Sequence, residues 1–339
     1  MNILVAGGAG YIGSHTMVEL INAGHDVICA DNLLNSKYES VKRVEKITNH
    51  KIKFYKVDFC NYEDAKQIFI ENKIDGIIHF AGLKCVPESI TVPLKYYQNN
   101  LISTLNILQL MQEFNVRNLV FSSSATVYGK PDTLPINENC HTGNTTNPYG
   151  TTKLMIEKIL MDIATSCPNY NIAILRYFNP VGAHPSGLIG EDPNGVPNNL
   201  VPFVTQVAIG LRPYINVNGN DYNTKDGTGV RDYIHVCDLA YGHVLAINKL
   251  ATNCGLVIYN LGTGIGYSVL DVIKAFDKVV GHQIPYKIVQ RRPGDIDACY
   301  ADPTKAFKEL GFKTKYTLDD MARDAWNWQV KNPKGYEED

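Results

Sequence analysis

A glycine-rich segment near the start of the chain constrains the fold more than any other feature. Residues 7–13 read Gly-Gly-Ala-Gly-Tyr-Ile-Gly and lie between the apolar run Ile3–Ala6 and the helical pattern Tyr11–Asn22. The segment matches both the GxGxxG and the GxxGxxG spacing. Glycines there let the backbone turn sharply and approach a pyrophosphate, which rests on amide N–H groups at a helix N-terminus. The segment is therefore typical of a nucleotide-binding strand–turn–helix unit.

The acidic residue after the second apolar run indicates which dinucleotide such a turn would bind. Asp31 lies 18 residues after Gly13, at the expected end of the second strand. A carboxylate at this point accepts hydrogen bonds from ribose hydroxyls and repels a 2′-phosphate. Residues 32–36, Asn-Leu-Leu-Asn-Ser, contain no arginine to bind that phosphate. The pattern favours NAD over NADP, the alternative being a structural turn with an incidental acid.

Val- and Ile-rich runs alternate with helical patterns throughout the first half of the chain. Strands are expected at Ile3–Ala6, Asp26–Ala30, Lys53–Val57, Gly76–Phe80, Arg117–Phe121 and Asn171–Arg176. Helices are expected between them, at Tyr11–Asn22, Glu39–Ile47, Tyr62–Glu71, Pro93–Phe114 and Pro148–Ala164. Strict alternation with near-continuously apolar strands is typical of a parallel sheet covered on both faces. The predicted fold class is α/β, a Rossmann-type doubly wound parallel sheet.

The pattern changes after residue 177. Residues 177–199 are rich in Gly, Ala and Pro, which predicts loops around a site rather than packed sheet. Further elements are expected at Leu200–Gly210, Tyr214–Val217, Val236–Lys249, Leu256–Leu261, Ser268–Val280 and Leu318–Val330. We expect an NAD-binding domain at 1–177 and a smaller C-terminal α/β substrate domain at 178–339, from which the chain is free to cross back to the first sheet.

Composition excludes several classes of partner. At ~150 residues per domain, 339 residues fit two domains. Lys and Arg total 32 against 34 Asp and Glu, which leaves no basic excess for nucleic acid. No apolar stretch reaches the roughly 18–20 residues that span a bilayer. The closest two of the eight cysteines, Cys237 and Cys254, are 17 positions apart, which excludes a CxxC metal motif. We expect a soluble cytoplasmic protein with reduced thiols and no bound metal.

One of three Tyr-x-x-x-Lys pairs lies where chemistry is expected. Tyr149 and Lys153 follow the fifth strand, whose carboxyl end carries three serines, residues 122–124. The spacing puts both side chains on one helix face, where an ammonium lowers the pKa of a phenol. Phenolate then serves as a general base for an alcohol proton. The other two pairs fall on early helices and are interpreted as solvated helix pairs.

Longer segments identify a family. Residues 122–129, Ser-Ser-Ser-Ala-Thr-Val-Tyr-Gly, and residues 147–153, Asn-Pro-Tyr-Gly-Thr-Thr-Lys, resemble the extended short-chain dehydrogenase/reductase superfamily. Residues 78–84, 175–185, 197–200 and 226–235 further resemble its UDP-glucose 4-epimerase family. The resemblance extends from Asn2 to about Trp328, essentially the whole chain.

The resemblance implies an isomerase of galactose metabolism that interconverts UDP-galactose and UDP-glucose. Tyr149 would take the proton of the sugar 4-OH while NAD accepts a hydride from C4. The 4-keto sugar would turn about its diphosphate link, and hydride and proton would return to its other face. Lys153 would lower the pKa of Tyr149 and hold the nicotinamide ribose. Ser124 would bond the reacting oxygen, the alternative being a strand-end cap.

The resemblance also assigns binding residues. Those expected around NAD are Gly7, Gly10, Tyr11, Ile12, Gly13, Asp31, Asn32, Asn35, Ser36, Asp58, Phe59, Phe80, Ala81, Gly82, Lys84, Asn99, Ser124, Tyr149, Lys153 and Phe178. Those expected around the UDP-hexose are Ser124, Tyr149, Asn179, Asn199, Leu200, Asn216, Val217, Asn218, Arg231, Arg292, Asp295 and Cys299. Two arginines suit a diphosphate because a guanidinium makes forked, charge-assisted contacts, although each could instead form a surface ion pair.

Two positions depart from the family pattern. Asn218 stands where an aromatic residue commonly precedes the glycine, so it would hydrogen-bond uracil but not stack on it. Cys299 stands where members restricted to plain hexoses tend to carry tyrosine. We hypothesise that the smaller side chain leaves room for an acetamido group and admits UDP-GlcNAc and UDP-GalNAc. The alternative is a small core thiol.

Rival functions remain for this fold. A 4,6-dehydratase needs acid and base groups beside the catalytic hydroxyl, where this chain has Ala125 and Thr126. An epimerase or decarboxylase of carboxylated UDP-sugars would want an additional cation near the sugar. A non-catalytic NAD sensor would usually lack the tyrosine or lysine. An epimerase returns every hydride, which separates it from a dehydrogenase that consumes NAD.

Two helices carry the expected oligomer contact. The helix at 93–114 has an apolar stripe at helical spacing, formed by Leu101, Leu105, Leu108 and Met111. Taken alone, such a stripe is more often core than interface. The family generally pairs through this helix and the one at 148–164, so we expect a homodimer.

Overall fold

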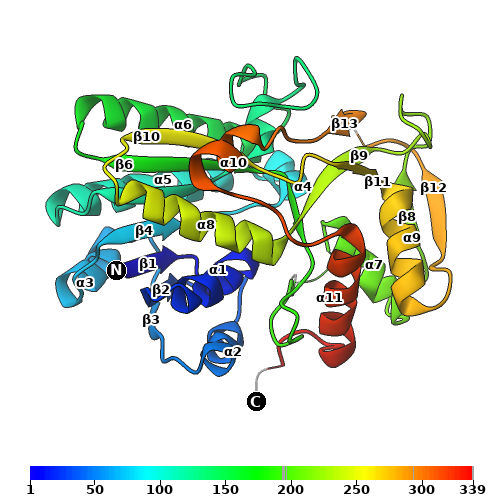
Figure 1. Cartoon of the computed structure of the whole chain (residues 1–339), viewed down its shortest axis with the longest axis horizontal. Helices are drawn as coiled ribbons and strands as arrows, with labels where there is room; N and C mark the ends of the chain where they lie inside the picture. The colour runs from blue at the N-terminus through cyan, green and yellow to red at the C-terminus, as the bar shows by residue number, and fades with distance from the viewer. Residues whose placement is uncertain (193–194, 196, 293, 338–339) are drawn as a thin grey trace.

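A seven-stranded parallel sheet forms the centre of the first and larger lobe (Figure 1). The computed structural model describes residues 1–192, 195, 197–292 and 294–337. The strands are β1 (Asn2–Ala6), β2 (Asp26–Asp31), β3 (Lys53–Lys56), β4 (Gly76–His79), β5 (Asn118–Ser124), β6 (Asn171–Tyr177) and β10 (Leu256–Leu261). Their order is β10-β6-β5-β4-β1-β2-β3, with parallel pairing throughout. The predicted Rossmann-type fold is confirmed.

Helices cover both faces of this sheet because alternate strand residues point to opposite sides. On β1, Ile3 and Val5 pack toward α1 (Tyr11–Asn22), α2 (Tyr38–Thr48) and α8 (Val236–Leu250). Leu4 and Ala6 pack toward α3 (Tyr62–Glu71), α5 (Pro93–Glu113) and α6 (Pro148–Ser166). The short helices α4 (Val86–Thr91) and η1 (Ala125–Tyr128) connect strands to this second layer.

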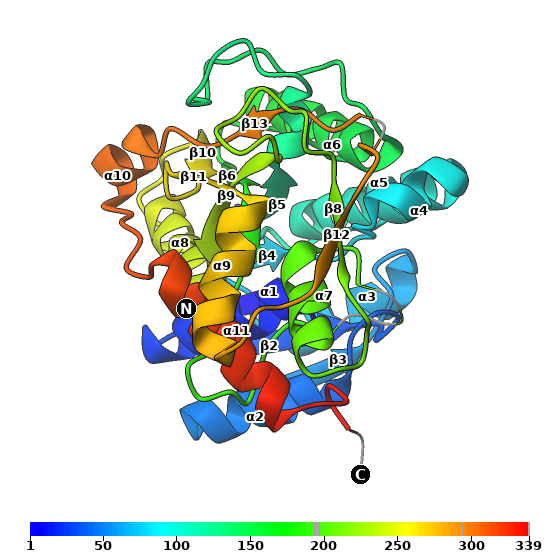
Figure 2. The ribbon, with the colours of Figure 1, turned by 90° about the vertical axis from the view of Figure 1, so that its right-hand side faces the viewer.

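The second lobe consists of small sheets and helices around a separate apolar core (Figure 2). Its four-stranded sheet contains β7 (Asn179–Val181), β9 (Val230–His235), β11 (Gly266–Ser268) and β13 (Ala298–Cys299), while β8 (Ile215–Asn218) pairs with β12 (Tyr286–Val289). Its helices are α7 (Leu200–Ala208), α9 (Val269–Val280) and α11 (Leu318–Lys331), and α10 (Thr304–Leu310) packs near β10. The chain crosses back to the first lobe through α8 and β10.

Most short elements of the second lobe escaped the sequence prediction, whereas the strand expected at Tyr214–Val217 is present as β8. Strand β9 contains Arg231 and Asp232, whose charges interrupt an apolar run, yet Asp232 is buried. Strand β12 is exposed along its whole length and lacks the alternation of a half-buried strand. By contrast, α1, α3 and β10 begin and end at the expected residues.

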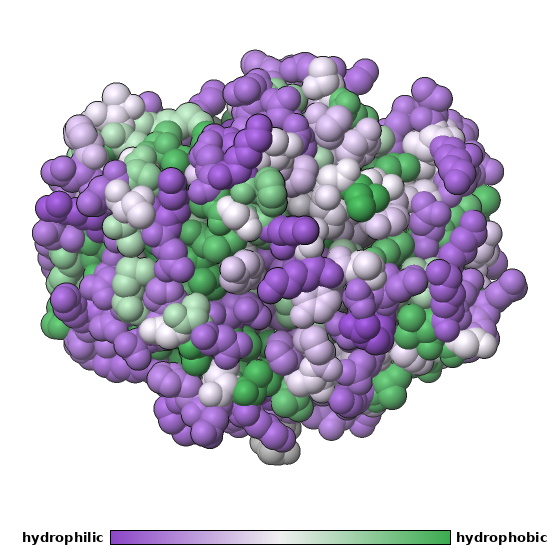
Figure 3. Space-filling view, viewed as in Figure 1, coloured by the Kyte–Doolittle hydropathy of each residue, from purple (hydrophilic) through white to green (hydrophobic). Residues whose placement is uncertain are grey.

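Polar side chains dominate the face of the molecule shown in Figure 3, with apolar residues in scattered patches between them. Within the described residues, no helix has the length and apolar character needed to cross a membrane.

Candidate active site

The carboxyl ends of the parallel strands meet at one edge of the sheet, where open α/β folds bind their ligands. At this edge the turn after β1 requires glycine. Gly7 has φ +80°, and a Cβ on it would lie 2.6 Å from the amide nitrogen of Ala81. A Cβ on Gly13 would lie 2.5 Å from the carbonyl oxygen of Gly7. The turn thus packs directly against the chain that follows β4.

Helix α1 opens toward the same edge. Its N-cap is Gly10, which supplies no side-chain hydrogen bond to the first turn. The N–H groups of this turn, which includes Tyr11 and Ile12, therefore face an anion site of the kind that a pyrophosphate fills. The Tyr11 hydroxyl donates to the carbonyl oxygen of Gly182 at 2.7 Å, which joins the turn to the second lobe.

The carboxylate of Asp31 organises the turn after β2. It accepts hydrogen bonds from the amide of Ala9 at 3.1 Å, the amide of Leu33 at 2.9 Å and the hydroxyl of Ser36 at 2.8 Å. Burial raises the pKa of Asp31, and these hydrogen bonds oppose the rise. The carboxylate therefore lies where the sequence predicted a ribose-binding acid, against the glycine turn.

The other residues expected around adenosine differ in how far they are exposed. The side-chain amide of Asn32 donates to Asp58 at 3.2 Å, and both Asp58 and Asn35 are exposed. Phe59 is buried in the apolar core, so it offers the site its backbone rather than its ring.

The chain after β4 forms another wall of the site. The amides of Phe80 and Ala81 donate to the carbonyl of Ala6 at 2.8 and 2.9 Å, which holds this segment beside β1. Gly82 follows with φ +155°. The half-buried Asn99 donates from its side chain to the Cys60 sulfur at 3.7 Å.

Lys84 and Asn199 converge on one carboxylate that the sequence analysis did not identify. Glu191 accepts from Lys84 at 3.3 Å and from the side chain of Asn199 at 2.7 Å. Asn199 is the N-cap of α7, and Leu200 is the first residue of that helix. Glu191 lies in an irregular segment with no motif around it, so no sequence signal marked it.

Ser124, Tyr149 and Lys153 come together at the carboxyl end of β5. Helix α6 begins with Asn147, whose side chain accepts from the amide of Gly150 at 2.8 Å. This cap places Tyr149 in the first turn, and Lys153 follows one turn later. The Lys153 ammonium donates to the Ser122 carbonyl at 2.7 Å and lies 5.9 Å from the Tyr149 ring centre.

Burial sets the charge states of this pair. It raises the pKa of Tyr149 to about 12, against a hydrogen bond with Ser124 that lowers it. Burial also lowers the pKa of Lys153 to about 8, against the nearby carboxylate of Glu157, which raises it. A positive charge close to the phenol favours its ionised form. The arrangement therefore suits proton transfer from an alcohol to a tyrosine oxygen.

Ser124 also has the structural role that the alternative interpretation gave it. Its hydroxyl accepts from the amide of Thr126 at 3.3 Å and caps η1. Because Ala125 and Thr126 follow it, no carboxyl group stands at the two positions where a dehydratase would place its acid and base.

The residues after β6 lie on the side of the site where the sugar is expected. Phe178 is buried in an apolar cluster with Val127, Ile136 and Ala301, and Cys299 packs against that cluster. Asn179 is exposed at the start of β7. The Cys299 side chain is small. Burial raises the pKa of its thiol to about 11, so the thiol is neutral at physiological pH.

The expected phosphate ligands surround one acid. Asp295 lies 3.8 Å from Arg231 and 3.0 Å from Arg292 in two ion pairs. Arg231 is opposite Cys299 in the pairing of β9 with β13. The structure therefore brings both arginines and Asp295 together close to Cys299.

The expected uracil segment is strand β8. Asn216 is exposed and Asn218 half-buried, whereas Val217 is buried in the second-lobe core. The two asparagine side chains are thus available to a base, and Val217 offers only its backbone.

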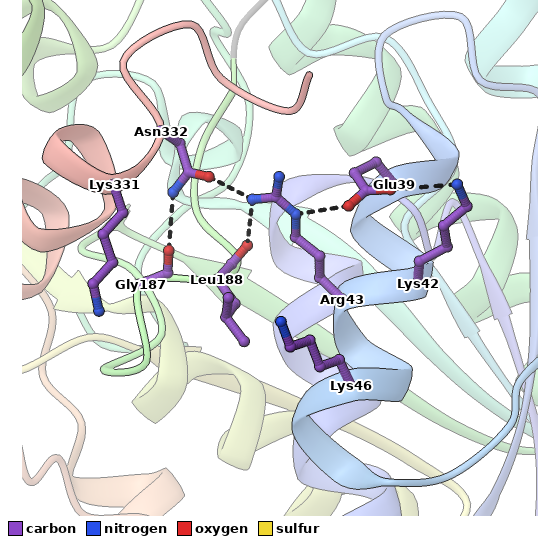
Figure 4. Close-up of a pocket in the computed structure, with 8 residues that line it drawn as sticks. All are labelled: Glu39, Lys42, Arg43, Lys46, Gly187, Leu188, Lys331 and Asn332. Carbon is purple, nitrogen blue, oxygen red and sulfur yellow. Dashed lines mark hydrogen bonds and ion pairs between the residues drawn. The ribbon is translucent and has the colours of Figure 1, made fainter. Parts of the chain in front are cut away.

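A separate groove lies between α2 and α11 and contains none of these residues (Figure 4). Arg43 extends from α2 into it and donates to Glu39 at 2.9 Å, to the Leu188 carbonyl at 3.1 Å and to Asn332 at 2.5 Å. Its bonds to Leu188 and Asn332 join α2 to the segment before residue 189 and to the end of α11, which indicates a structural role.

Comparisons with known proteins agree with this geometry. The family model for GDP-mannose 4,6 dehydratase matches residues 4–325. UDP-glucose 4-epimerase of Pasteurella multocida is 59% identical over 336 residues, 99% of each chain. The chain belongs to the UDP-glucose 4-epimerase family. The absence of acidic residues at 125 and 126 agrees with this assignment within the broader family of the model.

Solved structures of family members have the same fold. The structure of UDP-glucose 4-epimerase from Bifidobacterium longum, in complex with NAD+ and UDP, is 56% identical and has a TM-score of 0.96, with 99% of this chain and 100% of that chain covered. The UDP-Glc/GlcNAc 4-epimerase of Campylobacter jejuni is 34% identical, with a TM-score of 0.85 and coverage of 97% and 99%.

Proposed function

We propose that this epimerase-family chain interconverts UDP-galactose and UDP-glucose by inverting C4, with NAD as a recycled cofactor. The observation that supports this best is the meeting of Ser124, Tyr149 and Lys153 at the sheet edge that also holds the glycine turn. NAD, when bound, supplies the acceptor and donor of the C4 hydride. The close packing at Gly7 and the carboxylate of Asp31 fit its pyrophosphate and adenosine ribose.

The chain's own residues move the proton. Tyr149 accepts the proton of the sugar 4-OH and later returns it, while Ser124 bonds the same oxygen. Lys153 keeps a positive charge beside the phenol and so favours its ionised form. When the hydride returns to the other face of the 4-keto sugar, the configuration at C4 is inverted. The exposed walls near Asn179 and Asn199 would let the sugar turn while the diphosphate stays bound.

Charge complementarity supports the assignment of the nucleotide side. Arg231 and Arg292 would exchange their contacts with Asp295 for the two phosphates, leaving Asp295 for a ribose hydroxyl. Asn216 and Asn218 would meet uracil.

Proton NMR of the purified protein with UDP-galactose and no added cofactor tests the proposal. We expect UDP-glucose to appear, because an epimerase restores its cofactor in each cycle. If the sugar is unchanged even with excess NAD, the proposal is wrong. A stoichiometric loss of NAD would indicate a dehydrogenase instead.

Cys299 supports a second activity on N-acetylated sugars. The thiol is small and packs beside Phe178, where the bulk of a tyrosine would overlap an acetamido group. The Campylobacter jejuni family member, described as a UDP-Glc/GlcNAc 4-epimerase, shares the fold. We expect the wild type to convert UDP-GalNAc and Cys299→Tyr to lose this activity but keep the conversion of UDP-galactose. Unchanged UDP-GalNAc turnover in the variant would refute the size argument.

We also propose a cytoplasmic homodimer. Leu94, Ile102 and Leu105 on α5 and Met155 on α6 are all at least 41% exposed, which is unusual for side chains of this size. Leu108 and Met111 of the expected stripe lie in the core instead. All eight cysteines are free thiols, as a reducing compartment favours. Sedimentation should give twice the mass of one chain, and Leu105→Glu should weaken the pairing.

A further inference from the structure

Three residues on one face of α6 meet three consecutive serines of β5. Tyr149, Lys153 and Glu157 are four residues apart, so they project from one side of the helix. Lys153 donates to the Ser122 carbonyl at 2.7 Å, and the Ser123 hydroxyl donates to Glu157 at 2.5 Å. Ser124 lies close enough to Tyr149 to lower the pKa of its phenol against the effect of burial. Glu157 therefore takes part, with Tyr149 and Lys153, in the contact between α6 and β5.

Glu157 is buried and paired with a buried arginine. The side chains of Glu157 and Arg176 are 1% and 3% exposed. Arg176 donates to the carboxylate through Nε at 3.0 Å and through Nη2 at 2.6 Å. Since two charges gain little net stability from such burial, stability alone does not explain a paired carboxylate here.

The pair connects α6 to the remaining walls of the site. Arg176 also donates to the Tyr128 hydroxyl at 3.0 Å, which in turn donates to Asn260 on β10 at 2.7 Å. Tyr128 ends η1, which Ser124 caps, and Arg176 lies on β6 just before Phe178. A change at Glu157 would therefore act on elements that carry both the catalytic and the sugar-side residues.

The charge of Glu157 also acts on Lys153. The groups that face Lys153 include Tyr149 and Glu157 on its own helix and His79 at the end of β4. Burial lowers the pKa of His79 to about 3, so this imidazole is neutral at physiological pH. The Phe121 ring, 4.8 Å from the ammonium, is uncharged. The carboxylate of Glu157 raises the pKa of Lys153 and so favours the ammonium, and the Arg176 guanidinium paired with it offsets part of that effect.

We propose that Glu157 is a positioning residue for the reaction: held by Ser123 and Arg176, it sets α6 against β5 and keeps the Lys153 ammonium charged. This inference rests on the proposed roles of Ser124, Tyr149 and Lys153. Glu157 itself need not touch substrate or cofactor, because it acts through Lys153 and through the placement of α6.

Three variants and two measurements test this on the NAD-loaded protein. Glu157→Gln removes the charge, and the double variant Glu157→Gln with Arg176→Met also removes the unpaired arginine, so that it folds where the single variant fails. The first measurement is the pH titration of Lys153 by NMR of lysine labelled with carbon-13 at Cε, its signal assigned from its loss in Lys153→Arg. The second is kcat and KM against pH. Ser123→Ala, which keeps the ion pair, is the milder variant.

We expect Lys153 to titrate about one pH unit lower in Glu157→Gln, and lower by less than that in the double variant, which removes the arginine charge as well. At pH 8, kcat of Glu157→Gln should then fall about fivefold as the charged fraction drops from about a half to about a tenth, with KM changed little. Ser123→Ala should move both measurements in the same direction by less. An unchanged Lys153 titration, or wild-type kcat in the double variant, would overturn the proposal. If the wild type itself does not epimerise, the proposed function fails, and the NMR titration still decides the role of Glu157.

Discussion

The cofactor side and the sugar side of the site are built differently. The proposed cofactor side follows regular strands and helices, and Lys153 and Asp31 on it are buried, with 6% and 7% of each exposed, although its adenosine end at Asn35 and Asp58 is exposed. The sugar side is formed by loops and short strands, where Asn199 and Arg292 are exposed. Under the proposed function, packing in the first lobe fixes the reacting groups, while the second lobe would present exposed side chains to a turning sugar.

The largest expected effect falls on the buried side. Tyr149→Phe removes the proposed proton acceptor without changing the ring, so kcat should fall about a thousandfold. Activity against UDP-galactose and bound NAD should be measured together. Retained NAD with lost turnover would place the defect in proton transfer, whereas near-normal kcat would remove Tyr149 from the chemistry.

The second-largest expected effect is a difference in the free energy of unfolding between variants on the two sides. Arg176→Met leaves the Glu157 charge buried and unpaired, which should lower the free energy of unfolding by about 3–5 kcal/mol. Arg292→Ala breaks an ion pair whose arginine is 56% exposed, and should cost less than about 1 kcal/mol. Urea unfolding of both variants measures the contrast. Equal losses would show that the sugar side is as rigidly packed as the cofactor side.

The same Arg292→Ala variant, which should affect stability little, should weaken substrate binding strongly. Loss of one charge-assisted contact with a phosphate costs about 1.5–3 kcal/mol, so KM for UDP-galactose should rise by roughly ten- to hundredfold with little change in kcat. Lys278→Ala provides the matched control, because Lys278 also forms an exposed pair, with Asp319 at 3.4 Å. A KM that stays at the wild-type value would exclude Arg292 from phosphate binding.

The smallest expected effect is a pH dependence of a few fold. The pKa of Lys153 is lowered to about 8, so its ammonium is present below that pH and is lost as the pH rises through it. Activity that depends on this charge should therefore decline above about pH 8. Lys153→Arg stays charged and should lack this alkaline decline, whatever its absolute rate. A decline shared by both proteins would arise from another group.

The sequence predicted most of the first lobe and of its site. The glycine turn, Asp31 and the Tyr149–Lys153 spacing were readable because each lies at a fixed offset within one strand–turn–helix unit. Glu191 and Asn100 were not. Asn100 is buried and bonds both the amide and the carbonyl of Leu83, at 2.8 and 3.1 Å, contacts that cross 17 positions of chain. Glu157 had one signal, its place on the helix face of Tyr149 and Lys153.

By itself, the sequence determined the parallel sheet, the glycine turn and the helical spacing of Tyr149 and Lys153, because local periodicity and backbone sterics decide these over a few residues. Only the tertiary structure decided which charges are buried together and which side chains of a motif face the site. The tertiary structure paired Glu157 with Arg176 and buried the side chains of Phe59 and Val217 in the apolar cores. It also brought Arg231 and Arg292 to the same carboxylate, that of Asp295. Such contacts depend on segments far apart in the chain, whose approach follows from packing of the whole fold.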